Sequence, residues 1–310
     1  MPALTRSTTC LCCATAGLKK LFAGTYAPST LGSFLRSFTF GHVRQLDAVA
    51  WRWLVNICAV TPIVAGIDDY ALAGIDDTIK EVHGYQKQGS GYGYCGVRGL
   101  NALIGIVSTP ECPAADHRSR LRKGAAGSPR GAGKFTGDIP ATVNRLRSRA
   151  ATGVVLLRAD SAFYGHAVVA AAHRGGARVS ITARMDPAVK RAITTTGDDQ
   201  WTTIKYTDAI FDEDTGAWIS CAEVAEVSFT AFSSRRRGDR IAGRLVVRRI
   251  PELNPKADQG QPTLFDTHRF HAFFTTSDLD TVTADQTHRK HAIIEQINAD
   301  LKDSALAHCP

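Results

Sequence analysis

Three acidic positions far apart in the chain are placed where carboxylates could act together. Asp76 and Asp77 lie inside the apolar run "YALAGIDDTIKE", Asp160 follows the apolar run "VVLLRA", and Glu295 lies in "HAIIEQINADLKD". Carboxylate oxygens are the ligands that Mg²⁺ and Mn²⁺ prefer. Two such ions held close together can activate water and stabilise the leaving oxygen of a phosphodiester. We therefore take one of Asp76 and Asp77, together with Asp160 and Glu295, as candidate catalytic and metal-binding residues.

Each acid alone also has a structural interpretation. Asp160 precedes Ser161 and a predicted helix, so its side chain could cap that helix. Asp76 and Asp77 could belong to a turn at the end of their strand. The segment around Glu295 could be a surface helix with a solvated polar face. Only the combination of strand, strand and helix favours a shared site.

The segment from 288 to 303 predicts a single helix, because it lacks Gly and Pro and its apolar residues recur at steps of three and four. At about 100° per residue, four of its polar residues fall within an arc of roughly 60°. These residues are His288, His291, Glu295 and Lys302. The segment should therefore bury one side and present one polar line.

The charge of the chain favours a polyanionic partner such as nucleic acid. Lys and Arg total 37 against 29 Asp and Glu, which gives a net charge of +8. The run "SSRRRGDR" carries Arg235, Arg236 and Arg237, which could follow a DNA backbone. Arginines at the tip of a β-turn are also commonly just solvated.

The elements that would position these residues alternate between helix and strand. Two helices are predicted over about 30–62, followed by β-type runs over 70–84 and 96–109 and a polar, basic loop over 117–134. A helix at 139–150, a strand at 153–160, a helix at 164–174 and a strand at 177–185 then make an α/β domain. We predict an N-terminal helical segment (1–66), a core (67–199), a β-rich insertion (200–276) and a C-terminal helix (277–310).

Length and cysteine usage fit an intracellular protein. A chain of 310 residues with 44% hydrophobic content can bury a large core. Its eight cysteines are scattered, apart from a cluster at Cys10, Cys12 and Cys13, and we interpret them as reduced thiols. The longest apolar run, around Trp51 to Ala65, is interrupted and too short to span a bilayer. We expect a cytoplasmic, nucleoid-associated protein with no membrane partner.

Three motifs in order carry a resemblance to a known family. The runs "IDDTIKEVHGYQKQGSGYGYCGVRGLNAL", "LRADSAFYGHAVVAAAHRGGARVSITARMDPAV" and "HAIIEQINADLK" resemble bacterial insertion-sequence DDE transposases, close to insertion-sequence family thirteen-eighty. The resemblance implies an RNase H-like core with a β insertion between the second Asp and the Glu. It also implies cutting and joining of DNA by two Mg²⁺ or Mn²⁺ ions on Asp76, Asp160 and Glu295. The implied partners are transposon terminal inverted repeats, target DNA and a second copy in a homodimer.

The same family has a Tyr, Arg, Glu and Lys separated by two, three and six residues. These intervals place His288, His291, Glu295 and Lys302 at the corresponding positions, and imply DNA phosphate contacts for the histidines and the lysine. The family continues into further helices, so we expect this chain to be a copy truncated at its C-terminus. A non-catalytic DNA-binding remnant and an RNase H-like host nuclease are the alternatives.

Overall fold

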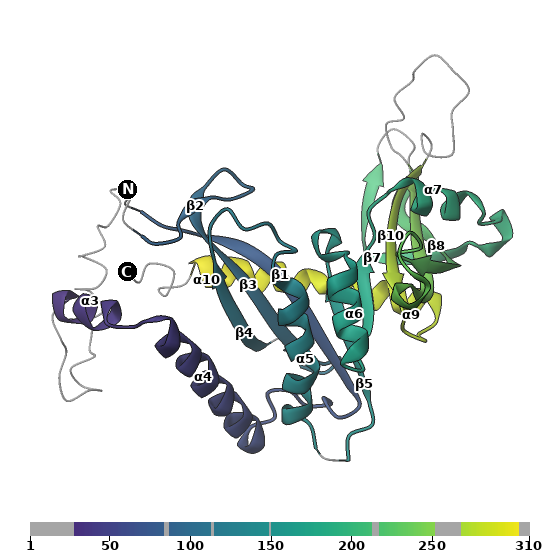
Figure 1. The fold of residues 1–310 in the computed structure, drawn as a ribbon. Coiled ribbons are helices and arrows are strands. Elements are labelled where there is room, and N and C mark those ends of the chain that lie inside the picture. Colours follow the sequence, from purple (N-terminus) through teal and green to yellow (C-terminus); the bar gives the residue numbers. More distant parts are fainter. Residues whose placement is uncertain are drawn as a thin grey trace.

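The structure is a computed structural model that describes residues 28–83, 87–112, 115–148, 150–212, 217–251 and 268–303. Its centre is one mixed ten-stranded sheet with the strand order β2-β3-β1-β5-β6-β10-β9-β8-β7, and β4 pairs with β3 beside this path. Helices cover both faces of the sheet (Figure 1). The fold is therefore mixed α/β, as predicted. The cluster of Cys10, Cys12 and Cys13, which we interpret as reduced thiols, lies outside the described residues.

The first half of the chain supplies the central strands. They are β1 (Tyr70–Glu81), β2 (Gly91–Tyr92), β3 (Arg98–Ser108), β4 (Ala115–Arg122), β5 (Val154–Ala159) and β6 (Arg178–Thr182). β1 and β3 pair antiparallel, whereas β1, β5 and β6 run parallel to one another. Ile75 of β1 lies opposite Ala159 of β5. Asp76 and Asp160, one residue further along each strand, therefore lie at the same level of the sheet.

The helices form one layer on each side of this sheet. They are α5 (Ala132–Leu146), α6 (His166–Arg174), α7 (Pro187–Thr194), α9 (Thr281–Arg289) and α10 (Ile293–Asp303). On one face, Phe135 of α5 and Val168 of α6 pack in the main core with Ile75. On the other face, Ile294 of α10 packs against Ile104 and Ile106 of β3. In Figure 1 α5 and α6 lie in front of the sheet, and α10 runs behind it.

Two helices precede the sheet, as predicted over 30–62. They are α3 (Pro28–Arg36) and α4 (Phe40–Val60). α4 buries Leu54 but leaves Leu46, Val49 and Trp53 exposed. No helix in the described ranges is both long and apolar enough to cross a bilayer.

The predicted β-rich region continues the same sheet. Its strands are β7 (Thr202–Asp212), β8 (Ala217–Ala231), β9 (Ile241–Pro251) and β10 (His268–Thr275). They pair antiparallel in turn, and β10 also pairs with β6. The region between Asp160 and Glu295 therefore extends the sheet beyond β6.

The predicted basic loop over 117–134 was wrong in its first part, which forms β4. Arg118 and Arg120 alternate along this strand and lie over the ring of Phe135, and Arg118 also pairs with Asp138 at 3.0 Å. Arginines at a period of two are compatible with a strand when their stems cover a neighbouring helix. The following helix also begins at Ala132, seven residues before the predicted start.

The single helix predicted over 288–303 was also wrong. α9 ends at Arg289, a 3₁₀ turn spans Lys290–Ala292, and α10 begins at Ile293. At this break, the buried guanidinium of Arg158 donates a hydrogen bond to the Thr287 carbonyl at 2.9 Å. A side chain inserted at a helical hydrogen-bond ladder is a common cause of a helix interruption.

Candidate carboxylate site

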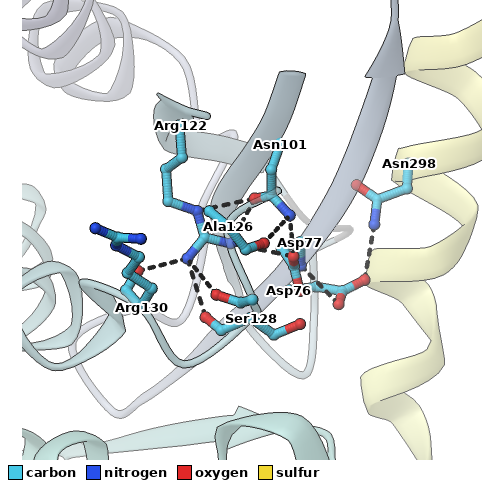
Figure 2. Close-up of polar contacts among 9 residues, drawn as sticks. Asp76, Asp77, Asn101, Arg122, Ala126, Ser128, Arg130 and Asn298 are labelled. Atoms are coloured by element: carbon cyan, nitrogen blue, oxygen red, sulfur yellow. Dashed lines mark hydrogen bonds and ion pairs between the residues drawn. The ribbon is translucent and has the colours of Figure 1, made fainter. Parts of the chain in front are cut away.

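Asp76 lies on the face of β1 that α10 covers. The Nδ2 atom of Asn298 donates to Asp76 Oδ2 at 2.8 Å, and the backbone N–H of Asp77 donates to Asp76 Oδ1 at 2.7 Å (Figure 2). Glu295 precedes Asn298 by three residues in α10, so both project from one side of that helix. α10 therefore brings Glu295 to the strand that carries the first acid.

The pKa of Asp76 shows that the three predicted acids influence one another. Burial is the largest cause and raises the pKa of the Asp76 carboxyl to about 6. The negative charges of Asp160, Asp77 and Glu295 raise the pKa further, whereas the Asp77 backbone N–H lowers it. The structure therefore brings Asp76, Asp160 and Glu295 to one region, although they come from two strands and a helix.

Asp160 lies at the end of β5 and is exposed at the rim of this region. Its Oδ1 accepts a hydrogen bond from the Ala162 backbone N–H at 3.0 Å and caps the 3₁₀ turn η1 (Ser161–Phe163). Partial desolvation raises the pKa of Asp160, the Ala162 N–H lowers it, and the charge of Asp77 raises it. The cap interpretation is confirmed, and it also holds the carboxylate in place next to β1.

Asp77 points to the opposite face from Asp76, because side chains alternate along a strand. Its carboxylate accepts hydrogen bonds from Asn101 and from Arg122 Nη2, the latter at 3.1 Å (Figure 2). Only 6% of Asp77 is exposed, and Asn101 is fully buried. Asp77 therefore belongs to a buried ion pair on the α5 side of the sheet, and Asp76 is the acid that faces Glu295.

The carboxylates match divalent cations in ligand type and charge. Asp76, Asp160 and Glu295 supply hard oxygen donors, and the repulsion that raises the pKa of Asp76 is one that a cation would relieve. Among the described residues, no three such side chains are already close enough to hold a metal ion. Glu295 is exposed, so its side chain can change rotamer without disturbing the core, whereas Asp160 is held by its hydrogen bond from the Ala162 N–H.

The four polar residues that we predicted on one helix face do not share a face in the structure. The two histidines point inward, whereas Glu295 and Lys302 are exposed. His288 points into the protein, where Nδ1 lies 2.8 Å from Ser180 Oγ and Nε2 lies 3.0 Å from Thr182 Oγ1. Its ring stacks on Phe273 with 4.1 Å between ring centroids. Burial, followed by the charge of Arg158, lowers the pKa of His288 to about 3, so the ring is neutral. This position does not favour a contact with DNA phosphate.

His291 is also turned inward. Its Cε1 atom lies 3.6 Å from where a Cβ on Gly74 would be, and both ring nitrogens are buried without a partner in the described structure. Burial lowers the pKa of His291 to about 3. The break between α9 and α10 explains why neither His288 nor His291 lies on the helix face that carries Glu295. Lys302, seven residues after Glu295 in the same helix, is exposed and remains on that face.

The three predicted arginines occupy the turn between β8 and β9. Arg235, Arg236 and Arg237 are all exposed. Phe232, which opens this turn with a φ of 60°, stacks on Tyr164 with 5.6 Å between centroids. Because Tyr164 follows Asp160 by four residues, the arginine turn lies at the end of the sheet that carries the carboxylates.

Sequence reasoning missed two residues of this region. Asn298 fixes one oxygen of Asp76, and its position three residues after Glu295 could have identified it. Arg184 donates from Nε to the Ser161 carbonyl at 3.2 Å, and its charge lowers the pKa of Asp160. Arg184 follows β6, which runs parallel to β5. Because the carboxyl ends of parallel strands meet at one edge of a sheet, the sequence could have placed Arg184 near Asp160.

No protein-family model matches the chain, and no curated protein matches it either. The functional interpretation therefore depends on the site and on the sequence motifs.

Proposed function

We propose that this chain is a DDE transposase that cuts and joins DNA at insertion-sequence ends. The observation that carries the proposal is geometric. Asp160 follows the parallel neighbour of the strand that carries Asp76, and Asn298, three residues after Glu295, donates a hydrogen bond to Asp76. The negative charges of Asp160 and Glu295 also raise the pKa of Asp76. Clusters of like charges that perturb a pKa are common in catalytic sites. Carboxylates in this arrangement suit two-metal phosphodiester chemistry.

The topology supports an RNase H-like core. The strands β4-β3-β1-β5-β6 form three antiparallel strands joined to two parallel ones, which is the arrangement expected of that core. The first acid lies on the central strand β1, the second follows its parallel neighbour β5, and the third lies on α10. β7 to β10 occupy the interval between the second and third acids, where the family resemblance implies a β insertion.

The chain's own residues would hold and orient the reacting groups. Asp76, Asp160 and Glu295 would bind two Mg²⁺ or Mn²⁺ ions, which when bound supply an activated water and charge stabilisation at the leaving oxygen. Asn298 orients Asp76, and the Ala162 N–H orients Asp160. Ile294 anchors α10 in the core next to Glu295, which limits the movement of the third acid.

The affinity for Mn²⁺ is expected to fall as the pH drops below 6. Protonation of Asp76, with its pKa of about 6, competes with the ion, so each pH unit further down should weaken binding by up to about tenfold. Calorimetric titration with MnCl₂ at pH 5 and pH 7 measures this difference. Equal affinities at the two pH values would show that Asp76 is not a ligand.

Arg235, Arg236 and Arg237 are proposed to contact DNA phosphates next to the carboxylates. Replacing all three by alanine should reduce the slope of log K against log salt concentration by up to about three, or roughly 0.9 per lost phosphate contact. Fluorescence anisotropy with a labelled duplex at several salt concentrations measures the slope.

The matched control replaces three exposed arginines that lie elsewhere, Arg36, Arg145 and Arg174. Arg174 ends α6, which begins just after Asp160 and runs away from it, so its loss should leave the local contacts intact. If both triple variants changed the slope equally, the effect would be one of net charge, and the arginine turn would have no special role.

The DNA partners and the homodimer are part of the same proposal. Leu46, Val49, Trp53, Asn56 and Val60 recur on α4 at alternating steps of three and four, and all five are exposed. This spacing places four apolar side chains and one asparagine in a single exposed stripe along α4, and such a stripe can be buried when two helices pack side by side. α4 is therefore the surface that we assign to a second copy of the chain.

A comparison of two plasmids separates the proposed function from its alternatives. One plasmid carries the repeats that flank the reading frame, and the other lacks them. A transposase should cut only the first plasmid, at the repeat ends, when Mg²⁺ or Mn²⁺ is present. A host nuclease would cut both, and a non-catalytic remnant would bind DNA and cut neither.

A further inference from the structure

A second site lies on the same face of the sheet, at the other end of β1. An open cavity of about 720 Å³ is lined by the start of β1, the end of β3 and one side of α9. Tyr70 lines it and lies six residues from Asp76 along the strand, which corresponds to roughly 20 Å. The volume is typical of sites for small molecules. Tyr70 is thus distant from Asp76, whereas Arg158, which also lines the cavity, precedes Asp160 by only two residues, or roughly 7 Å along the chain.

A buried cation without a counter-ion lines this cavity. Arg158 is 1% exposed, and its Nη1 and Nη2 atoms donate to the Thr287 carbonyl and to Ser108 Oγ, at 2.9 and 3.4 Å. Its Nε atom is buried with no hydrogen-bond partner, and no carboxylate in the described ranges pairs with the guanidinium. A guanidinium keeps its positive charge in proteins. An unpaired buried charge is costly, and an anion would relieve that cost.

Further donors surround the same space. The Tyr70 hydroxyl is buried without a partner, and burial raises the pKa of Tyr70 to about 12, so it keeps its proton. Lys290 lines the rim and is exposed. Two carboxylates are also near: Glu111 lines the cavity, and the charge of Asp278 contributes to the raised pKa of Tyr70. Both residues are exposed, so water screens their charges. The donors come from β1, β5 and the turn after α9.

We propose that this cavity binds a phosphate group, with Arg158 Nε, the Tyr70 hydroxyl and Lys290 as its donors. Donors that approach from three elements suit an ion with three or four acceptor oxygens better than a carboxylate, which has two. The phosphate can belong to a small molecule such as a mononucleotide or to a DNA backbone. The proposal does not depend on the transposase assignment, because none of its donors belongs to the carboxylate site.

The test measures phosphate binding by the full chain and by Tyr70→Phe, with calorimetric titrations of sodium phosphate and of thymidine 5′-monophosphate. Tyr70→Phe removes one hydroxyl and keeps the ring, so the fold should be preserved. The parent should bind saturably, and the variant should bind roughly tenfold more weakly, the loss expected for one hydrogen bond to a charged group. Tyr92→Phe, at an exposed tyrosine outside the cavity, is the matched control and should bind as the parent does.

The two titrations, together with competition by a DNA duplex, also identify the molecule to which the bound phosphate belongs. Tighter binding of the nucleotide than of inorganic phosphate indicates a small-molecule ligand, whereas displacement of phosphate by a DNA duplex indicates the backbone. If neither compound bound saturably, or if Tyr70→Phe bound like the parent, the proposal would fail, and Arg158 would only connect β5 to the end of α9. Thermal unfolding of both variants without ligand verifies that they are folded.

Discussion

Replacing Asp76 by asparagine is expected to abolish metal-dependent DNA cleavage and to leave the fold at least as stable at pH 7. Cleavage should fall by on the order of a thousandfold or more, because several kcal/mol of transition-state stabilisation depend on the metal ions that Asp76 would bind. The variant should retain its affinity for DNA, because the arginine turn is unchanged. Cleavage of a labelled duplex and anisotropy on the same preparation measure the two effects separately.

The stability part of this prediction follows from the pKa of Asp76. The folded value of about 6 is above the ordinary 3.8, so the favourable contribution of this group is fully present below pH 3.8 and is lost as the pH rises through 6. At pH 7 the ionised carboxylate of Asp76 therefore lowers the stability of the fold by roughly 3 kcal/mol, a cost that an uncharged asparagine does not carry. Asn298 can accommodate the change by rotating its amide, because its Oδ1 atom is buried without a partner.

Thermal unfolding at pH 4 and pH 7 measures this effect. The melting temperature of the Asp76→Asn variant, relative to the parent, should be higher at pH 7 than at pH 4. A difference that did not change with pH would contradict the raised pKa. Loss of cleavage together with loss of folding would leave Asp76 with a structural role only.

Replacing Asp77, the next residue, by alanine is expected to have the opposite effect on stability. It should lower the free energy of unfolding by about 3 to 5 kcal/mol, because the buried guanidinium of Arg122 would lose its counter-ion and keep only neutral acceptors such as Asn101 and the Ser128 carbonyl. The amide of Asn101 would lose a partner as well. The midpoint of urea denaturation measures the loss, and the folded fraction should still bind Mn²⁺ as the parent does.

The control for Asp77→Ala is Asp198→Ala, which removes a partner of Arg249 at the surface. Asp198 is 98% exposed, so its ion pair at 3.5 Å should contribute less than about 1 kcal/mol. Equal destabilisation by the two substitutions would contradict the buried pair. Loss of Mn²⁺ binding in folded Asp77→Ala would make Asp77, and not Asp76, the first acid.

The sequence predicted the parts of the site that depend on local pattern. The apolar runs before Asp160 and around Asp76 are strands, and the ends of parallel strands meet at one edge, so their proximity followed from topology. The helical spacing around Glu295 likewise predicted that one face would be buried. These inferences required only the periods of strand and helix.

Other parts depend on contacts between distant residues. The two-residue alternation of side chains along a strand shows that Asp76 and Asp77 face opposite sides of β1. Only the position of α10 decides which of them faces Glu295. The break that turns His288 and His291 inward coincides with Arg158, which is 129 residues from Thr287 in the chain. β4 was interpreted as a loop because its arginines are polar, whereas the guanidinium groups of Arg118 and Arg120 lie over the Phe135 ring and pair with Asp138.

The most direct test of the central claim is cleavage of a plasmid that carries the flanking repeats, by the parent chain, Glu295→Gln and Asp300→Asn. Asp300 is exposed on the same helix, five residues further on and therefore about 140° around its axis, so it controls for a change of charge on α10. The account predicts Mn²⁺-dependent cuts at the repeat ends by the parent and by Asp300→Asn, and none by Glu295→Gln. Cutting that persists in Glu295→Gln, or that is absent from the parent while DNA binding is retained, would contradict it.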